Sequence, residues 1–223
     1  MQRKLRQWRD EPYMMYFFLG LQILLFLVMT LFGGSQNSNV LVFFGAKVNI
    51  LIQQGQWWRL IMPIFLHSGL MHIAVNSVTL YFIGMQIESL FGHWRFTLIY
   101  LLSGIVGNIA SFVFNTGISV GASTALFGLF GAFFMLVEAF RQNTAIRAMG
   151  QQFALFIVLN LAFDLFNPGI DLAGHVGGLL GGFLVANIVG VPRIRSVSVL
   201  RRIITLIILV LASGIFLYMG FTN

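Results

Sequence analysis

The sequence predicts an all-α membrane protein whose helices cross the bilayer several times. Apolar side chains make up 58% of the 223 residues and charged side chains only 9%, whereas soluble domains average about 25% charged. The mean hydropathy is +0.91. Long apolar runs recur along the chain, without the alternating pattern of an outer-membrane barrel. A water-soluble globular enzyme is excluded, because too few charges remain to cover its surface.

Seven apolar runs are each predicted to form a helix that crosses the membrane. A bilayer core about 30 Å thick needs about 20 helical residues, and six of the runs approach this length. The fifth run falls well short of it, so we expect a short or tilted helix there. In chain order, the runs are residues 14–31, 70–91, 96–114, 123–140, 153–166, 172–191 and 203–221.

The distribution of basic residues predicts the orientation of these helices. If the chain crosses the membrane seven times, all but two of the 13 Lys and Arg residues fall on one side of it. Only Lys47 and Arg59 lie on the other side. The positive-inside rule then places the N-terminus in the cytoplasm and the C-terminus outside, in a multi-pass protein of the cell membrane. The basic residues on the cytoplasmic side are Arg3, Lys4, Arg6, Arg9, Arg95, Arg141, Arg147, Arg193, Arg195, Arg201 and Arg202.

This topology divides the chain into three parts. We expect a cytoplasmic N-terminal segment over residues 1–13, a six-helix core over residues 14–191, and a cytoplasmic loop with a seventh transmembrane helix over residues 192–223. The external segment 33–69 is long, and we expect it to pack on the bundle as a partly embedded loop. Topology also explains the net charge of +7, so nucleic acid is not an expected partner.

Polar side chains inside apolar runs are the candidate functional residues, because they are costly in hydrocarbon and tend to face the bundle interior. The separation along the chain between Ser123 and Arg141 equals that between His175 and Arg193. At the rise per residue of an α-helix, Ser123 lies about 27 Å above Arg141, and His175 lies about 27 Å above Arg193. The two side chains are therefore predicted to share a layer near the outer surface.

Two further polar side chains belong to the same layer. Asn76 and His72 both precede Arg95 on the second run, at heights of about 28 and 34 Å above it. Their i, i+4 spacing places them on one helix face. Both can donate hydrogen bonds.

These residue types together suit acyl transfer. A serine hydroxyl becomes an effective nucleophile when an imidazole takes its proton, and acyl transfer needs donors aimed at the developing oxyanion. We expect a Ser–His dyad rather than a triad, because no carboxylate is expected at this depth beside His175. Asp171 falls in the external turn, and Asp164 and Asn160 near the outer end of the fifth run need no special role.

Small residues would allow the serine and histidine helices to approach closely. Gly174, Gly178 and Gly182 recur at a spacing of four, and such faces let helix backbones touch. The run that begins at Ser123 offers its own small residues, which are Gly121, Ala125, Gly128 and Ala132. This packing would bring Ser123 within hydrogen-bond reach of His175.

The chain resembles the rhomboid intramembrane serine proteases. Four motifs carry the resemblance, in order and at matching depths, over most of the chain from Trp58 to Gly182. They are Trp58-Arg59, His72-Ile73-Ala74-Val75-Asn76, Gly121-Ala122-Ser123 and Gly174-His175-Val176-Gly177-Gly178 with Gly182. The resemblance implies a six-helix core to which the seventh helix is a C-terminal addition.

The resemblance also implies roles for individual residues. Ser123 would be the nucleophile and His175 the general base. His72, Asn76 and the Ser123 backbone N–H would form the oxyanion hole, and Gly121 would give the substrate backbone close access.

Other positions would support this machinery. The resemblance implies a structural role for five of them, which are Trp58, Arg59, Glu88, Gly178 and Gly182. Phe127 stands where some members carry a Tyr that packs on the histidine.

The function predicted from the sequence is a serine-type endopeptidase that cleaves peptide bonds in or near transmembrane helices of membrane proteins. No cofactor is expected, and no metal site, because the pattern His-Glu-x-x-His is absent. Two alternatives stay open. A non-catalytic relative would bind membrane helices without cleaving them, and a small transporter would also place polar residues inside its bundle.

Overall fold

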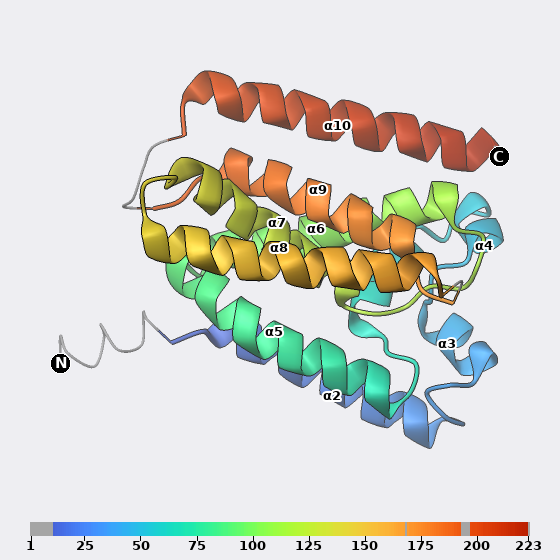
Figure 1. Ribbon diagram of the computed structural model, residues 1–223. Coiled ribbons are helices and arrows are strands. Elements are labelled where there is room, and N and C mark those ends of the chain that lie inside the picture. Colours follow the sequence, from blue (N-terminus) through green and yellow to red (C-terminus); the bar gives the residue numbers. More distant parts are fainter. Residues whose placement is uncertain (1–10, 168, 193–196, 223) are drawn as a thin grey trace, which may run out of the picture.

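The computed structural model describes residues 11–167, 169–192 and 197–222 and is built from helices, as predicted (Figure 1). Within these ranges no β-strand forms, and an isolated β-bridge pairs Lys47 with Ser119. Some of the basic residues used to predict the orientation lie outside the described residues. They are Arg3, Lys4, Arg6, Arg9, Arg193 and Arg195.

Seven long helices account for the seven apolar runs. Six of those described are long and apolar enough to cross a membrane, and α7, with 17 residues, is shorter. Their bounds are α2 Tyr13–Leu31, α5 Leu70–Phe91, α6 His93–Phe114, α7 Ser123–Ala139, α8 Thr144–Leu165, α9 Leu172–Val189 and α10 Val199–Thr222.

The prediction of a short fifth helix is wrong. Helix α8 has 22 residues and begins at Thr144, well before the apolar run predicted to form it. The side chain of Asn143 accepts a hydrogen bond from the Ile146 N–H at 3.1 Å and so caps the first turn. Because a helix can begin with polar residues at its aqueous end, hydropathy alone underestimated its length.

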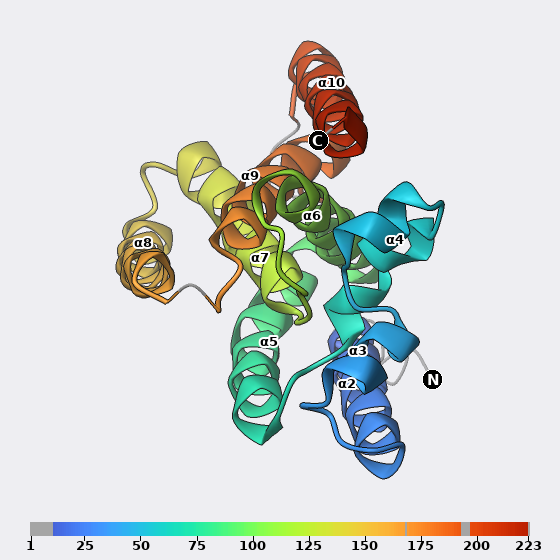
Figure 2. The same ribbon diagram turned by 90° about the vertical axis from the view of Figure 1, so that its right-hand side faces the viewer.

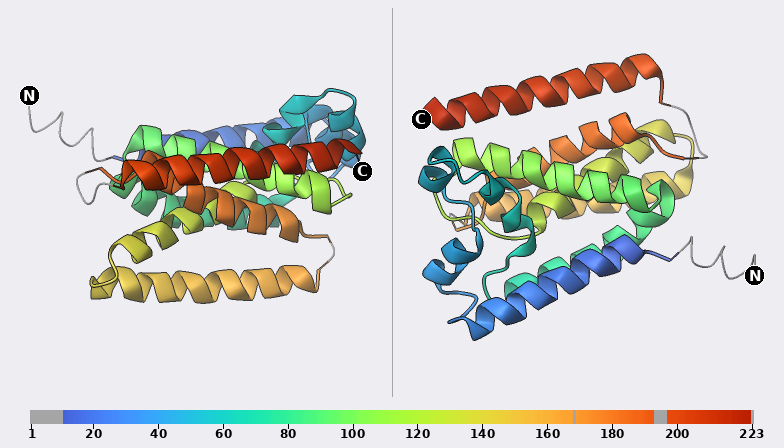
Figure 3. Two further views of the ribbon diagram at one scale, coloured as in Figure 1. Left: turned by 90° about the horizontal axis from the view of Figure 1, so that it is seen from above. Right: turned by 180° about the vertical axis from the view of Figure 1, so that it is seen from behind.

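The axes of the long helices are roughly aligned, and the helices form a bundle around α6, α7 and α9 (Figures 1 and 3). Seen end-on, α8 flanks this centre on one side and α10 on another, while α2 and α5 form a pair below it (Figure 2). The nucleophile candidate Ser123 opens α7, and His175 lies in the first turn of α9. Both are therefore carried by central helices.

The glycine face of α9 explains why α7 and α9 lie so close together. A Cβ atom on Gly178 would overlap the carbonyl oxygen of Thr124, and one on Gly182 would overlap that of Gly128. The two backbones are thus in direct contact, as small residues at a spacing of four permit.

The segment between α2 and α5 packs on the bundle. Ile64 and Leu66 in it are fully buried. Arg59 holds the segment together by donating to the carbonyl oxygens of Val42 and Ala46 at 2.8 and 2.9 Å. The segment contains α3 Ser38–Phe44, α4 Asn49–Gln53 and two 3-10 turns, η1 Trp57–Leu60 and η2 Met62–Phe65.

Candidate active site

The structure brings Ser123 and His175 into hydrogen-bond contact. The Nε2 atom of His175 lies 2.7 Å from the Ser123 Oγ. His175 is buried, with 7% of its surface exposed, whereas Ser123 is half-buried. The pair has the geometry expected of a nucleophile and the base that takes its proton.

A carboxylate lies on the other side of the same imidazole. Oδ2 of Asp164 is 2.6 Å from Nδ1 of His175, and Asp164 is itself 5% exposed. The expectation that no carboxylate would lie beside His175 is therefore wrong. Asp164 lies one residue before the end of α8, and the turn that follows returns the chain antiparallel, so the last turn of α8 lies beside the first turn of α9.

A sequence signal for this contact was present. Asp164 lies in the last turn of α8 and His175 in the first turn of α9, the next helix along the chain. Residues at such mirrored positions face each other when two helices form an antiparallel hairpin. Asp164 was instead predicted to lie near the end of its run, apart from the layer of His175.

An aromatic ring covers one face of His175. The Phe127 ring stacks on the imidazole with centroids 4.4 Å apart and an interplanar angle of 11°. Phe127 lies one turn after Ser123 on α7, so the same helix carries the hydroxyl and the ring that packs on the base. The ring limits the orientations open to the imidazole.

Gly121 leaves space beside Ser123 that no other residue would leave. Its φ of +131° favours glycine. A Cβ atom there would lie 2.7 Å from His72 Nε2 and 3.5 Å from Ser123 Oγ. The absence of a side chain keeps this approach to the hydroxyl open.

Three hydrogen-bond donors belong to His72, Asn76 and Ser123, which line one cavity. The Ser68 N–H donates to Nδ1 of His72 at 3.4 Å, which assigns the ring proton to Nε2, the atom that faces Gly121. Asn76 donates one of its two amide hydrogens to the His72 carbonyl at 2.9 Å, which leaves the second for another acceptor. The Ser123 N–H lies in the first turn of α7, where no intrahelical acceptor is available.

The Ser123 hydroxyl opens into a cavity of about 660 Å³ between α5, α7, α8 and α9. His72, Asn76, Ser123, Asp164 and His175 all line it. The cavity thus joins the candidate nucleophile, base and oxyanion donors in one space large enough for a peptide segment.

Comparison with known proteins identifies the family. The Rhomboid domain matches residues 54–192, which include all of the candidate catalytic and oxyanion residues. The chain belongs to the rhomboid family.

Similar proteins include two from Bacillus subtilis (strain 168) and one from Toxoplasma gondii. This rhomboid is 42% identical to Rhomboid protease GluP over 210 residues, which cover 94% of this chain and 41% of GluP. It is 39% identical to Putative rhomboid protease YdcA over 144 residues, 62% of this chain and 70% of YdcA. It is 40% identical to Rhomboid-like protease 1 of T. gondii over 154 residues, 66% of this chain and 52% of that protein. The chain thus spans about two fifths of GluP.

In this rhomboid, two further sets of polar contacts hold the loops that carry the site, and Ser119 and Asp171 of the second set also line the cavity. The first is His67, which is fully buried and accepts the Ala122 N–H at 3.4 Å through Nε2. Burial lowers the pKa of His67 to about 3, and the nearby His72 ring adds to this effect. A neutral His67 therefore fixes the residue immediately before Ser123.

The second cluster surrounds Asp171, the N-cap of α9. Its carboxylate accepts hydrogen bonds from the Ser119 hydroxyl at 2.6 Å, from the Gly174 N–H at 3.0 Å and from the Ser111 hydroxyl. Burial acts to raise the pKa of Asp171, but these hydrogen bonds outweigh it and hold the pKa below its usual value. The cluster fixes the start of α9 only one helical turn before His175.

The positions predicted to give support have different surroundings. Glu88 accepts the backbone N–H groups of Met14 and Met15 at 2.9 and 2.7 Å, and so holds the start of α2 against α5. Trp58 is half exposed at the surface, beside buried Arg59. Gly178 and Gly182 form the backbone contact with α7 described above.

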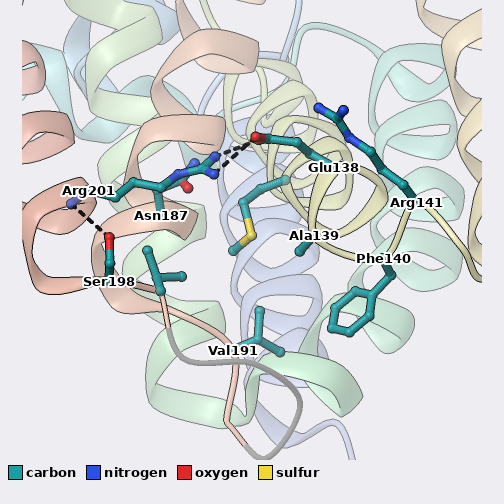
Figure 4. Close-up of a pocket in the computed structure, with 10 residues that line it drawn as sticks. Glu138, Ala139, Phe140, Arg141, Asn187, Val191, Ser198 and Arg201 are labelled. Carbon is teal, nitrogen blue, oxygen red and sulfur yellow. Dashed lines mark hydrogen bonds and ion pairs between the residues drawn. The ribbon is translucent and has the colours of Figure 1, made fainter.

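A second cavity, of about 440 Å³, lies at the opposite end of the bundle (Figure 4). There Arg201 forms a bidentate ion pair with Glu138, with N···O distances of 3.0 and 2.5 Å. This ion pair joins α10 to the end of α7. No His lines this cavity within the described ranges, and the hydroxyl oxygen of Ser198 in its lining accepts the Arg201 N–H at 3.3 Å. Among the described residues, no three His, Asp or Glu side chains cluster as metal ligands would.

Proposed function

We propose that this rhomboid is an intramembrane serine endopeptidase whose substrates are transmembrane helices of other proteins. The observation that carries the proposal is the 2.7 Å contact between Ser123 Oγ and His175 Nε2, inside a cavity that also contains hydrogen-bond donors. The names of similar proteins, such as Rhomboid protease GluP, support the same activity.

In the acylation step, the Ser123 Oγ attacks the carbonyl carbon of the scissile peptide bond while its proton passes to Nε2 of His175. The C–N bond then breaks, and the leaving amine takes the proton from Nε2. The product of this step is an acyl-enzyme ester on Ser123. A water molecule next attacks the ester carbon, gives one proton to His175, and releases the second fragment as Ser123 recovers its hydrogen.

The oxyanion formed in both steps needs donors in place before the reaction. The Nε2–H of His72, the free amide hydrogen of Asn76 and the Ser123 N–H are the candidates, because all three belong to residues that line the same cavity. Donors fixed in a site of low dielectric stabilise developing charge strongly, and loss of one typically costs about 10²–10³-fold in rate.

The site lies near the outer face of the membrane in this proposal. Ser123 opens α7, whereas Arg141 follows the other end of α7 and Arg147 lies in the first turns of α8. The positive-inside rule assigns that basic end to the cytoplasm. Substrate helices that unwind easily near their outer ends are expected to be preferred, because a regular helix hides its carbonyl groups in its own hydrogen bonds.

A serine-directed fluorophosphonate probe tests the proposal. The full chain, purified in detergent, should be labelled in a single position, and Ser123→Ala should abolish both labelling and cleavage of a reconstituted transmembrane substrate. We expect a loss of about 10⁴-fold or more, the scale seen when a nucleophile is removed. Ser89→Ala is a matched control, since Ser89 is exposed on α5 and bonds only the Gln86 carbonyl.

The competing functions give different results in the same experiment. Labelling that persists in Ser123→Ala would refute the nucleophile assignment. A folded wild-type protein that is never labelled and cleaves no helix would indicate a non-catalytic binder of membrane helices. Solute uptake into liposomes that survives loss of Ser123 would indicate a transporter.

A further inference from the structure

The cavity at the end of the bundle opposite Ser123 has no part in the proposed protease. It holds about 440 Å³ and lies where α7 ends at Ala139 and α10 begins at Val199 (Figure 4). A helix that spans a membrane ends where the hydrocarbon gives way to lipid headgroups. The cavity therefore lies at the depth of the headgroups of the surrounding phospholipids.

The charged side chains in its lining leave a surplus of positive charge. They are Glu138, Arg141 and Arg201. The ion pair with Glu138 uses two of the five N–H donors of the Arg201 guanidinium, so three remain. Arg141 lies beside Glu138, is exposed, and forms no ion pair within the described ranges (Figure 4). Two guanidinium groups thus face a single carboxylate.

Two polar residues complete this side of the cavity. The Ser198 hydroxyl caps the first turn of α10 by accepting the Arg201 N–H, so the positive end of the α10 dipole also lies at the cavity. Asn187 is fully buried, and its amide donates to the Phe183 carbonyl at 2.8 Å. The Oδ1 atom of Asn187 has no hydrogen-bond partner among the described residues. Because an unsatisfied buried acceptor is costly, this atom favours a ligand that carries a donor.

The rest of the lining is apolar. At the start of α10, beside the cavity, Val199 and Leu200 are 72% and 67% exposed. An inorganic anion gains nothing from such surroundings, whereas an amphiphile places its charged end on the arginines and its chains on the apolar residues. The apolar residues that line the cavity are Met135, Phe140, Val191 and Val197.

We infer that this cavity binds the headgroup of an anionic phospholipid that carries hydroxyl groups, as phosphatidylglycerol does. The phosphate accepts hydrogen bonds from Arg141 and Arg201, and a headgroup hydroxyl donates to the Oδ1 of Asn187. Basic pockets between transmembrane helices are suited to such headgroups. The lipid would join α7 to α10, a helix that buries only Thr205 and Gly220 of its described residues. This inference is independent of the proposed protease activity.

Three lipids with the same acyl chains test the ligand class. They are phosphatidylglycerol, which is anionic and has hydroxyls; phosphatidylmethanol, which is anionic and has none; and phosphatidylcholine, which has no net charge and no hydrogen-bond donor. Native mass spectrometry of the full chain in detergent measures the affinity for each. We expect affinity to fall in that order, by about tenfold or more from first to last, the scale of one charge-assisted hydrogen bond. Equal affinity for all three would overturn the inference.

Charge variants test the location. Arg141→Gln should weaken binding of phosphatidylglycerol by about tenfold, whereas Glu138→Gln should strengthen it, because a negative charge is removed from the lining. Arg147→Gln is a matched control, since Arg147 is exposed in the first turns of α8 at the same end of the bundle and does not line the cavity. We expect this control to stay within twofold of the unmodified chain. An equal loss in both arginine variants would indicate attraction to the surface in general and would overturn the inference.

The headgroup contact has a test of its own. Asn187→Leu keeps the size of the side chain and should lower the affinity for phosphatidylglycerol to that for phosphatidylmethanol; a preference that survives would overturn the assigned contact. Melting temperatures in detergent show whether this variant is folded, and if it is not, the comparison of the two lipids on the unmodified chain decides. Free glycerol 1-phosphate should not displace the lipid at equal concentration. Displacement would assign the cavity to a soluble phosphate ester and overturn the lipid as its ligand.

Discussion

Helices α9 and α8 are neighbours in sequence but are held in the bundle in different ways. Helix α9 buries nine of its 18 residues, and five of them are glycines. Its Gly178 and Gly182 touch the α7 backbone, while Gly177 and Gly181 pack on Ala110 and Val106 of α6. Helix α8 buries three of its 22 residues.

The two helices hold opposite sides of one imidazole. His175 and Ser123 are fixed by backbone contact between α9 and α7, where neither helix can shift without steric overlap. Asp164 is held by the few buried residues of α8, supported by rings such as Phe153, whose centroid lies 4.8 Å from that of Phe133. The comparison teaches that Ser123 and His175 are held together by tightly packed helices, whereas the carboxylate beside His175 is carried by a helix with far fewer buried residues.

Disrupting the contact between α9 and α7 should have the largest effect on labelling of Ser123 and on stability. In Gly178→Ala, the added methyl group overlaps the Thr124 carbonyl, which is backbone and cannot move aside. We expect α7 and α9 to separate, fluorophosphonate labelling of Ser123 to fall by about 10²-fold, and stability to fall by about 2–3 kcal/mol. Labelling rate and melting temperature in detergent measure the two effects.

The matched control is Gly20→Ala, on exposed α2, where an added Cβ meets nothing within 4 Å. Alanine is the better helix former there, so stability should be unchanged or slightly higher. Equal behaviour of the two variants would show that the glycine contact does not hold the pair together.

Weakening the packing of α8 on the bundle should have a smaller effect on labelling and on stability. Ile157 is 3% exposed and lies midway between Gly150 and Asp164, the other buried residues of α8. We expect Ile157→Ala to cost about 2 kcal/mol or less and to slow labelling only a few-fold, because the outer end of α8 is held less firmly near His175. Val158→Ala, 62% exposed on the same helix, should leave both quantities unchanged. A labelling loss as large as that of Gly178→Ala would contradict the contrast drawn between the helices.

The smallest effect should be a dependence of stability on pH, caused by a lysine in the segment between α2 and α5. Lys47 is fully buried and donates to the carbonyl oxygens of Asn115 and Gly117. Burial lowers its pKa to about 8, although Asp171 partly opposes the shift. Between pH 8 and 10.5 the unfolded chain binds the proton more tightly than the folded chain, so stability should rise with pH across this window.

Melting temperatures at a pH near 7.5 and one near 9.5 test this prediction, because the two values lie on either side of the folded-state pKa. Lys47→Met, which keeps the length of the side chain, should remove most of the pH dependence. A melting temperature that falls with pH in the unmodified chain, or an unchanged slope in the variant, would show that Lys47 does not titrate as its burial implies.

Much of the fold could be predicted from sequence, because membrane-spanning helices leave a direct signal in hydropathy. All seven apolar runs correspond to helices, and the long segment between α2 and α5 packs on the bundle. The errors in the predicted helix bounds occurred where a helix ends in polar residues. The part of α8 before Phe153 was missed because Arg147 and the glutamines that follow it interrupt the apolar run, although a helix tolerates such residues where it leaves the membrane.

Within the candidate site, the contact between Ser123 and His175 followed from counting helical rise and from the glycine spacing. The roles of His72 and Asn76 as oxyanion donors stay predictions. Asp164 was missed because it was assigned to the outer end of its apolar run, whereas its carboxylate lies level with the His175 ring. Depth places a residue along the bundle axis, but it does not show which neighbouring helix a side chain faces.

The order of the spans, the glycine face of α9 and the common depth of the hydroxyl and imidazole were determined by the sequence alone, because hydropathy and helical periodicity are local properties of the chain. Only the tertiary structure decided that α8 turns its one acidic residue toward His175 and that His67 and Asp171 hold the ends of the site. Those contacts depend on how each helix is rotated about its own axis, and packing between helices, rather than any local pattern, sets that rotation.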